Sequence, residues 1–118
     1  MPKKILAVMS DLFFLIKIND AAKKLGITIE FVKDGALALE KVQSKPDAVI
    51  FDLSCEAADP VTLIRAIKGN PETSHIRTIA FVSHVRVDLK RNAEDAGCDL
   101  VVARSAFAQN LSAILTAP

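Results

Sequence analysis

The sequence predicts an α/β fold, a doubly wound sandwich of parallel strands with helices on both faces. Short apolar runs alternate with segments of helical periodicity along the whole chain. Glycine, proline and aspartate turn signals separate the two kinds of segment. Strands separated by helices run parallel, and right-handed crossovers place helices on both faces of the sheet. Five such units fit the strand order 2-1-3-4-5.

The first units are defined by an apolar strand, a helix and a more polar strand. Ile5 to Met9 is the first apolar run. Leu12 to Leu25 has helical periodicity and stops at Gly26, a residue typical of helix C-termini. In the segment Ile27 to Val32, polar residues alternate with apolar ones, which predicts a strand at the edge of the sheet.

The next unit leads to the centre of the sheet. After a turn at Asp34-Gly35, residues Ala36 to Ser44 form a short amphipathic segment that ends near Pro46. Ala48 to Phe51 is an uninterrupted apolar run. Such a run predicts a strand that is buried on both faces.

A loop from Leu53 to Ala58 follows this buried strand. Asp59 and Pro60 then predict a helix start, with aspartate as the N-cap and proline in the first helical position. We expect this helix to run to Lys68. The remaining elements are predicted as a strand, a helix, a short strand and one final helix, in the ranges Thr78 to Val82, Val87 to Ala96, Leu100 to Ala103 and Ala106 to Leu115.

Composition and charge predict a single globular domain spanning residues 1–118, of which 51% are hydrophobic and 25% charged. The net charge of +1 gives no basis for binding nucleic acid or an anionic membrane. No apolar stretch approaches the length of a membrane span. Cys55 and Cys98 lack metal-ligand spacing and are expected to be free thiols. We therefore expect a cytoplasmic protein with no nucleic-acid or membrane partner.

Chemistry-bearing residues follow the predicted strands at the edge where ligands gather in open α/β sheets. They are Met9, Ser10, Asp52, Ser83, His84, Arg104 and Ser105. A carboxylate, a hydroxyl and a cation at one rim fit the transfer of a phosphoryl group to the carboxylate. Asp52 would be the nucleophile, Ser83 would donate to a phosphoryl oxygen, and Arg104 would offset the charge.

Several motifs resemble those of the receiver domain of two-component response regulators, chemotaxis regulators included. They are Lys4-Ile-Leu-Ala-Val8, Pro46-Asp-Ala-Val-Ile-Phe-Asp52, Asp59, Phe81-Val-Ser83, Glu94-Asp-Ala-Gly97 and Asp99-Leu-Val-Val-Ala-Arg104. The resemblance covers essentially the whole chain. It implies a flavodoxin-like fold and a signalling role in a phosphorelay, not an enzyme. It also implies Asp52 as phosphoacceptor and Ser83 as the switch hydroxyl.

The implied partners are a histidine kinase or phosphotransfer protein and an output protein. Receivers commonly contact their output partner through the fourth helix, fifth strand and fifth helix, here the face from Val87 to Leu115. There is no glycine-rich phosphate loop after the first strand and no Gly-x-Ser-x-Gly motif, so an enzyme of another class on this fold is disfavoured.

The chain also departs from the receiver pattern. The acidic pair that holds Mg²⁺ in receivers is replaced by Met9 and Ser10. Asp11 follows by one residue and fits either a helix N-cap or a displaced metal ligand beside Asp52. Arg104 replaces the usual lysine, and Val101 replaces the aromatic switch residue. Weak Mg²⁺ binding is the expected result.

Two functions therefore remain open. The first is a degenerate receiver, or pseudo-receiver, in which phosphorylation of Asp52 is impaired by the loss of the metal ligands. The second is a docking or scaffold module on the same fold that works without phosphorylation. Two site alternatives also remain. Asp52 could instead hydrogen-bond a neighbouring loop, and Arg104 could pair with Asp52 and hold the site shut.

Overall fold

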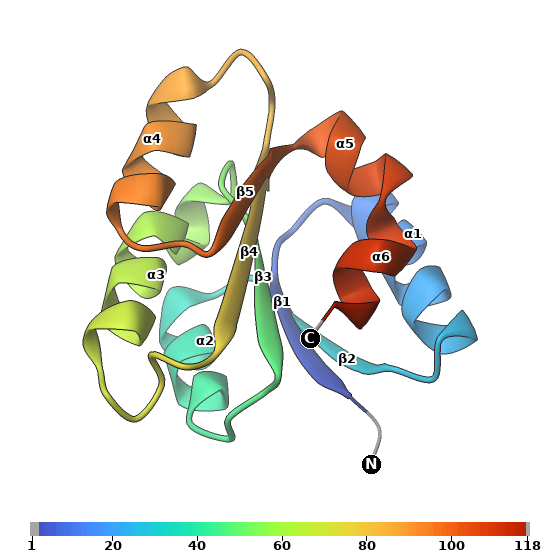
Figure 1. The fold of residues 1–118 in the computed structure, drawn as a ribbon, viewed down its shortest axis with the longest axis horizontal. Coiled ribbons are helices and arrows are strands. Elements are labelled where there is room, and N and C mark those ends of the chain that lie inside the picture. The colour runs from blue at the N-terminus through green and yellow to red at the C-terminus, as the bar shows by residue number, and fades with distance from the viewer. Residues whose placement is uncertain (1–2, 118) are drawn as a thin grey trace.

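The computed structural model describes residues 3–117 as one parallel sheet between two layers of helices (Figure 1). The strands lie in the order β2-β1-β3-β4-β5, which confirms the predicted fold class and strand order. The strands are β1 (Lys4–Val8), β2 (Thr28–Val32), β3 (Ala48–Asp52), β4 (Arg77–Val82) and β5 (Leu100–Ala103). The helices are α1 (Leu12–Lys24), α2 (Gly35–Val42), the 3₁₀ turn η1 (Glu56–Ala58), α3 (Pro60–Gly69), α4 (Val87–Asp95), α5 (Arg104–Gln109) and α6 (Leu111–Thr116).

The two faces of the sheet bury separate hydrophobic clusters because side chains alternate along each strand. Val49 and Phe51 of β3 pack in the cluster under α2, α3 and α4, whereas Ile50 packs in the cluster under α1, α5 and α6. Figure 1 shows these two groups of helices on opposite sides of the sheet. By the same alternation Asp52 lies on the α1 and α5 side, and its register partner on β4 is Phe81.

The predicted final helix is in fact two helices, α5 and α6, separated at Asn110. The Asn110 backbone lies outside the helical region, with φ −112° and ψ 22°. Its side-chain amide and its backbone N–H both donate to the carbonyl of Ala106, at 2.8 and 3.1 Å. Asparagine side chains compete with regular helix bonding in this way, which accounts for the break.

Asp59 begins α3 without acting as the predicted side-chain N-cap. Its φ is +48°, in the left-handed region, and its carboxylate accepts a hydrogen bond from the Thr62 hydroxyl at 2.8 Å. Pro60 occupies the first turn as predicted. The other element boundaries lie within two residues of the predicted ones, and those of β5 coincide with them.

A close backbone approach fixes the loop that follows Asp52. A Cβ added to Gly35 at the start of α2 would lie 2.7 Å from the carbonyl oxygen of Ala58 in η1. Only glycine permits this contact, so α2 and the η1 turn support each other beside the end of β3.

A polar cluster closes the amino end of β4. The carboxylate of Asp99 accepts bonds from the Thr78 N–H at 2.8 Å and the Thr78 hydroxyl at 3.1 Å, and it pairs with the Lys68 ammonium at 2.6 Å. Lys68 also donates to the carbonyls of Ser74 and Ile76. Burial alone would raise the pKa of Asp99, but hydrogen bonds from Lys68 and Thr78 and the Lys68 charge outweigh it and lower that pKa.

Within residues 3–117, no helix combines the length and the apolar composition needed to cross a membrane.

Candidate functional site

Asp52 ends β3 as predicted, but its side chain is buried and already bonded. The residue is 3% exposed. Its Oδ1 accepts a hydrogen bond from the Ser54 hydroxyl at 2.6 Å and another from the Ser54 backbone N–H at 3.0 Å. An aspartate that bonds the backbone two residues ahead forms an Asx turn. The neighbouring-loop alternative is therefore correct for this oxygen, and both of its lone-pair sites are occupied.

Arg104 is the first residue of α5 and lies between two carboxylates. Its Nη2 is 2.9 Å from Oδ2 of Asp11 and 3.7 Å from Oδ2 of Asp52. We call the set Asp11, Arg104 and Asp52 the carboxylate–arginine bridge. The alternative in which Arg104 pairs with Asp52 corresponds to the longer of these two contacts, which is an ion pair without a hydrogen bond.

Two aromatic rings form the floor of this bridge. The Arg104 guanidinium carbon lies 5.1 Å from the ring centre of Phe14 and 5.8 Å from that of Phe81. The two rings meet edge to face, with 4.8 Å between their centres. Cation–π attraction of this kind holds an arginine whose fork is only partly paired.

Asp11 is the helix N-cap, one of the two functions that the sequence left open, and its second carboxylate oxygen pairs with Arg104. Its Oδ1 caps α1 by accepting the backbone N–H groups of Phe13 at 3.0 Å and Phe14 at 3.3 Å. Its Oδ2 belongs to the carboxylate–arginine bridge. The capping rotamer thus also brings the carboxylate toward Asp52, because both carboxylates reach the same guanidinium nitrogen.

The residues at this rim fit Mg²⁺ poorly. Mg²⁺ requires several oxygen ligands in octahedral geometry, commonly carboxylates and phosphates. Asp11 and Asp52 are the carboxylates at the rim, and a positively charged nitrogen lies between them. Among residues 3–117, no group of three or more histidine, cysteine, aspartate or glutamate side chains has a metal-binding arrangement. The Arg104 cation thus already pairs with the two carboxylates that would have to bind a metal ion.

Ser83 lies after β4 as predicted, but its hydroxyl does not reach Asp52. The side chain is exposed, and its backbone carbonyl accepts the N–H of Arg86 at 2.9 Å. Within residues 3–117, no hydrogen bond joins the Ser83 hydroxyl to Asp52.

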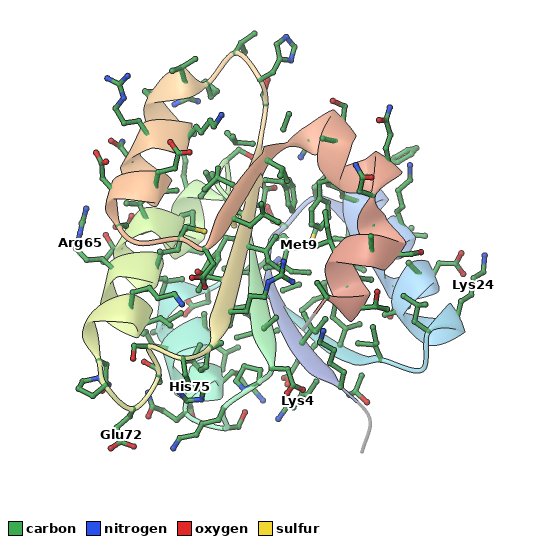
Figure 2. The ribbon with its side chains drawn as sticks, viewed as in Figure 1. Lys4, Met9, Lys24, Arg65, Glu72 and His75 are labelled. Atoms are coloured by element: carbon green, nitrogen blue, oxygen red, sulfur yellow. The ribbon has the colours of Figure 1, made fainter. Side chains whose placement is uncertain are left out.

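The predicted rim is divided into two parts. Ser83, His84, Arg104 and Ser105 line a surface hollow of about 570 Å³ together with Asp11, but Asp52 does not line it. Met9 is 2% exposed and packs in the hydrophobic cluster under α1, so its predicted place in the crevice is wrong (Figure 2). The cause is strand alternation, which puts Met9 on the same face as Ile5 and Ala7.

Sequence reasoning missed Ser54, the residue that holds Asp52. The signal was present, because an aspartate at a strand end commonly bonds the backbone N–H two residues ahead, here that of Ser54. The aromatic floor was also missed. Phe14 and Phe81 lie 67 positions apart in the chain as numbered, and only the assembled sheet brings them under Arg104.

The solved structures that superpose on this chain include response regulators and receiver domains. A response regulator from Hahella chejuensis superposes with a TM-score of 0.86 at 25% identity, over 97% of this chain and 92% of that chain. The receiver domain of sensor histidine kinase PA1611 from Pseudomonas aeruginosa superposes with a TM-score of 0.84 at 22% identity, over 98% of this chain and 95% of that chain. That structure carries a magnesium ion in its active-site cleft. The phosphorylated cyanobacterial phytochrome response regulator RcpA superposes with a TM-score of 0.83 at 20% identity, over 98% of this chain and 89% of that chain.

Sequence comparison alone does not reach this result. No protein-family model matches the chain, and no curated protein matches it. The strand order, the layering of the helices and the superposition over nearly the full length agree with one another. The chain has the fold of a response-regulator receiver domain.

Proposed function

We propose that this protein is a receiver-like signalling domain whose phosphoacceptor, Asp52, is poorly phosphorylated. The observation that carries the proposal is the carboxylate–arginine bridge, in which the Arg104 cation lies between Asp11 and Asp52. In a working receiver, a metal ion offsets the charge of the incoming phosphoryl group. Here a side-chain cation already neutralises part of the acidic charge without any phosphate.

Three features oppose the attack of Asp52 on a phosphoryl donor. One carboxylate oxygen is occupied by two bonds from Ser54. The other faces Arg104, and the side chain as a whole is 4% exposed. A donor must therefore displace Arg104 from Asp52 before the carboxylate oxygen can reach phosphorus. Each of these rearrangements adds to the barrier, and weak Mg²⁺ binding removes the usual compensation.

The proposed signalling partners are a histidine kinase or phosphotransfer protein and an output protein. The face from Val87 to Leu115 comprises α4, β5, α5 and all of α6 but its last residue, and it remains the proposed output surface. Two apolar side chains at its edge, Val85 and Val87, are 68% and 60% exposed, which supports a role in protein contact.

A docking or scaffold module that needs no phosphorylation is the second candidate. The bridge also favours it, because Arg104 pairs with the acidic groups in the absence of phosphate. The two candidates differ in one respect. A receiver changes the α4–β5–α5 face when Asp52 is phosphorylated, whereas a docking module does not.

The deciding experiment is phosphorylation by a small acyl phosphate, with and without Mg²⁺, measured by intact mass. We expect the wild type to gain a phosphoryl group slowly and with little dependence on Mg²⁺. The double variant Ser10→Asp, Arg104→Lys restores an acid and a compact cation, and we expect it to react at least about 10-fold faster with Mg²⁺. Asp52→Asn in each background is the matched control and should gain nothing.

Each result selects one candidate. Rapid, Mg²⁺-dependent phosphorylation of the wild type would overturn the impairment. No phosphorylation of either protein would overturn the role of Asp52 as phosphoacceptor and leave the docking module. A gain in the double variant, absent with Asp52→Asn, supports a receiver site that the bridge holds shut.

A further inference from the structure

The hollow beside the bridge has the size and composition of a small-molecule site. Its volume of about 570 Å³ falls in the usual range for ligand pockets. Apolar groups form much of its wall, and hydroxyls and cations are placed among them. The lining residues that matter here are Phe13, Phe14 and Ala108 on the apolar side, and Lys17, Ser105 and Arg104 on the polar side.

The charge around this hollow is basic and incompletely paired. Lys17 and Arg104 line it, against the single carboxylate of Asp11. Asp11 already caps α1 and pairs with Arg104. Within residues 3–117, no carboxylate lies in ion-pair contact with Lys17. An anionic group that enters the hollow therefore meets an unpaired ammonium.

The apolar wall is unusual for a solvent-facing surface. Phe13 is 88% exposed although it stands one residue from the buried Phe14. A phenyl ring left in water forgoes the free energy that burial of its apolar area would give. A ligand that covers Phe13 while its charged group reaches Lys17 would use both features together.

We propose that the hollow binds a small organic anion, an apolar body that carries a carboxylate or phosphate group. The body packs on Phe13 and Ala108, and the charged group accepts hydrogen bonds from Lys17 and the Ser105 hydroxyl. Asp52 does not line this hollow, so binding requires neither phosphorylation nor a metal ion. The hollow shares Asp11 and Arg104 with the carboxylate–arginine bridge but not Asp52, so the inference stands whether or not Asp52 is phosphorylated.

The test is a titration of the isotope-labelled protein followed by backbone amide NMR. Phenyl phosphate and benzoate are the two probes and distinguish the charged groups. Benzyl alcohol is the control for the apolar part of the ligand without its charge, and inorganic phosphate is the control for the charged group without the apolar part. We expect saturable shifts at the start of α1, at Ser83 and His84, and along α5 for at least one of the two probes.

Single substitutions locate the site. Lys17→Gln should weaken binding about fivefold, the upper range for one exposed charge contact, and Phe13→Ala should weaken it as well. Lys24→Gln is the matched control, because Lys24 lies at the far end of α1, paired with Asp20 (Figure 2). All three side chains are exposed, so the fold should survive each change.

Three outcomes would overturn the proposal. The first is a chemical shift change that does not saturate. The second is a loss of affinity in Lys24→Gln equal to that in Lys17→Gln. The third is binding of benzyl alcohol or inorganic phosphate as tight as that of the probes. Asp52→Asn should retain binding. Retained binding in that variant separates this inference from the phosphoacceptor proposal, since each can fail without the other.

Discussion

Each end of the sheet holds an aspartate facing a cation, and the two pairs are built differently. At the amino end, Asp99 and Lys68 are 2.6 Å apart, and the Lys68 side chain is 16% exposed. At the carboxyl end, Asp52 and Arg104 are 3.7 Å apart, and the Arg104 side chain is 45% exposed. The first cation donates to two carbonyls as well, whereas the second is shared with another carboxylate.

The difference lies in how closely the two ion pairs are bonded. Around Asp99, the cation, the hydroxyl and the N–H groups each have a short bond, although the Asp99 side chain itself is 43% exposed. Around Asp52, only the contacts with Ser54 are short. Arg104 is held by its 2.9 Å bond to Asp11 and by two aromatic rings, whereas its contact with Asp52 is 3.7 Å.

The largest expected effect comes from neutralising each aspartate in turn. Asp99→Asn should lower the free energy of unfolding by about 2 kcal/mol, because the mostly buried Lys68 loses its counter-charge. Asp52→Asn should cost about 0.5 kcal/mol or less, because it removes a buried charge whose cation is distant. Urea unfolding followed by circular dichroism measures both. Equal losses of unfolding free energy in the two variants would contradict the difference between the two ends of the sheet.

Removing one hydroxyl at each end of the sheet should give a smaller difference in unfolding free energy. Ser54→Ala should cost about 1 kcal/mol, since Asp52 keeps the Ser54 backbone N–H. Thr78→Val should cost more, about 2 kcal/mol, because the Thr78 hydroxyl both donates to Asp99 and accepts its N–H. The same urea experiment applies. A greater loss for Ser54→Ala would contradict the contrast.

The smallest expected effect is the pH dependence of the Asp99 cluster. The pKa of Asp99 is lowered in the folded protein, so the carboxylate stabilises the fold above the unfolded pKa near 4, and this contribution falls as pH drops through the folded value. The stability difference between wild type and Asp99→Asn should therefore shrink below about pH 4. A constant difference from pH 7 to pH 3 would show that the charge of Asp99 does not contribute.

The fold could be predicted from the sequence because it depends on periodicity and on handedness rules that hold for any α/β chain. The buried run from Ala48 to Phe51 and the alternating run from Ile27 to Val32 lie at the centre and edge of the sheet, as predicted. The break at Asn110 was not predicted, because a side-chain bond to Ala106 competes with an otherwise helical segment.

The candidate site was predicted less completely, since its contacts join distant parts of the chain. Asp52 and Arg104 were identified by their places at strand ends, and the alternative that they pair was correct. The reach of Asp11 depends on its capping rotamer, which sequence spacing does not determine. The place of Met9 could have been predicted, because Ile5, Ala7 and Met9 alternate toward one face.

The aromatic floor under Arg104 has a spectroscopic consequence. The chain contains no tryptophan and no tyrosine, so intrinsic fluorescence offers little information about this site. Protons held above the face of a phenyl ring experience its ring current and resonate upfield. The Arg104 side-chain protons lie near the rings of Phe14 and Phe81 and should show such displaced resonances. Their return toward ordinary values would report directly, in solution, that Arg104 has left the bridge.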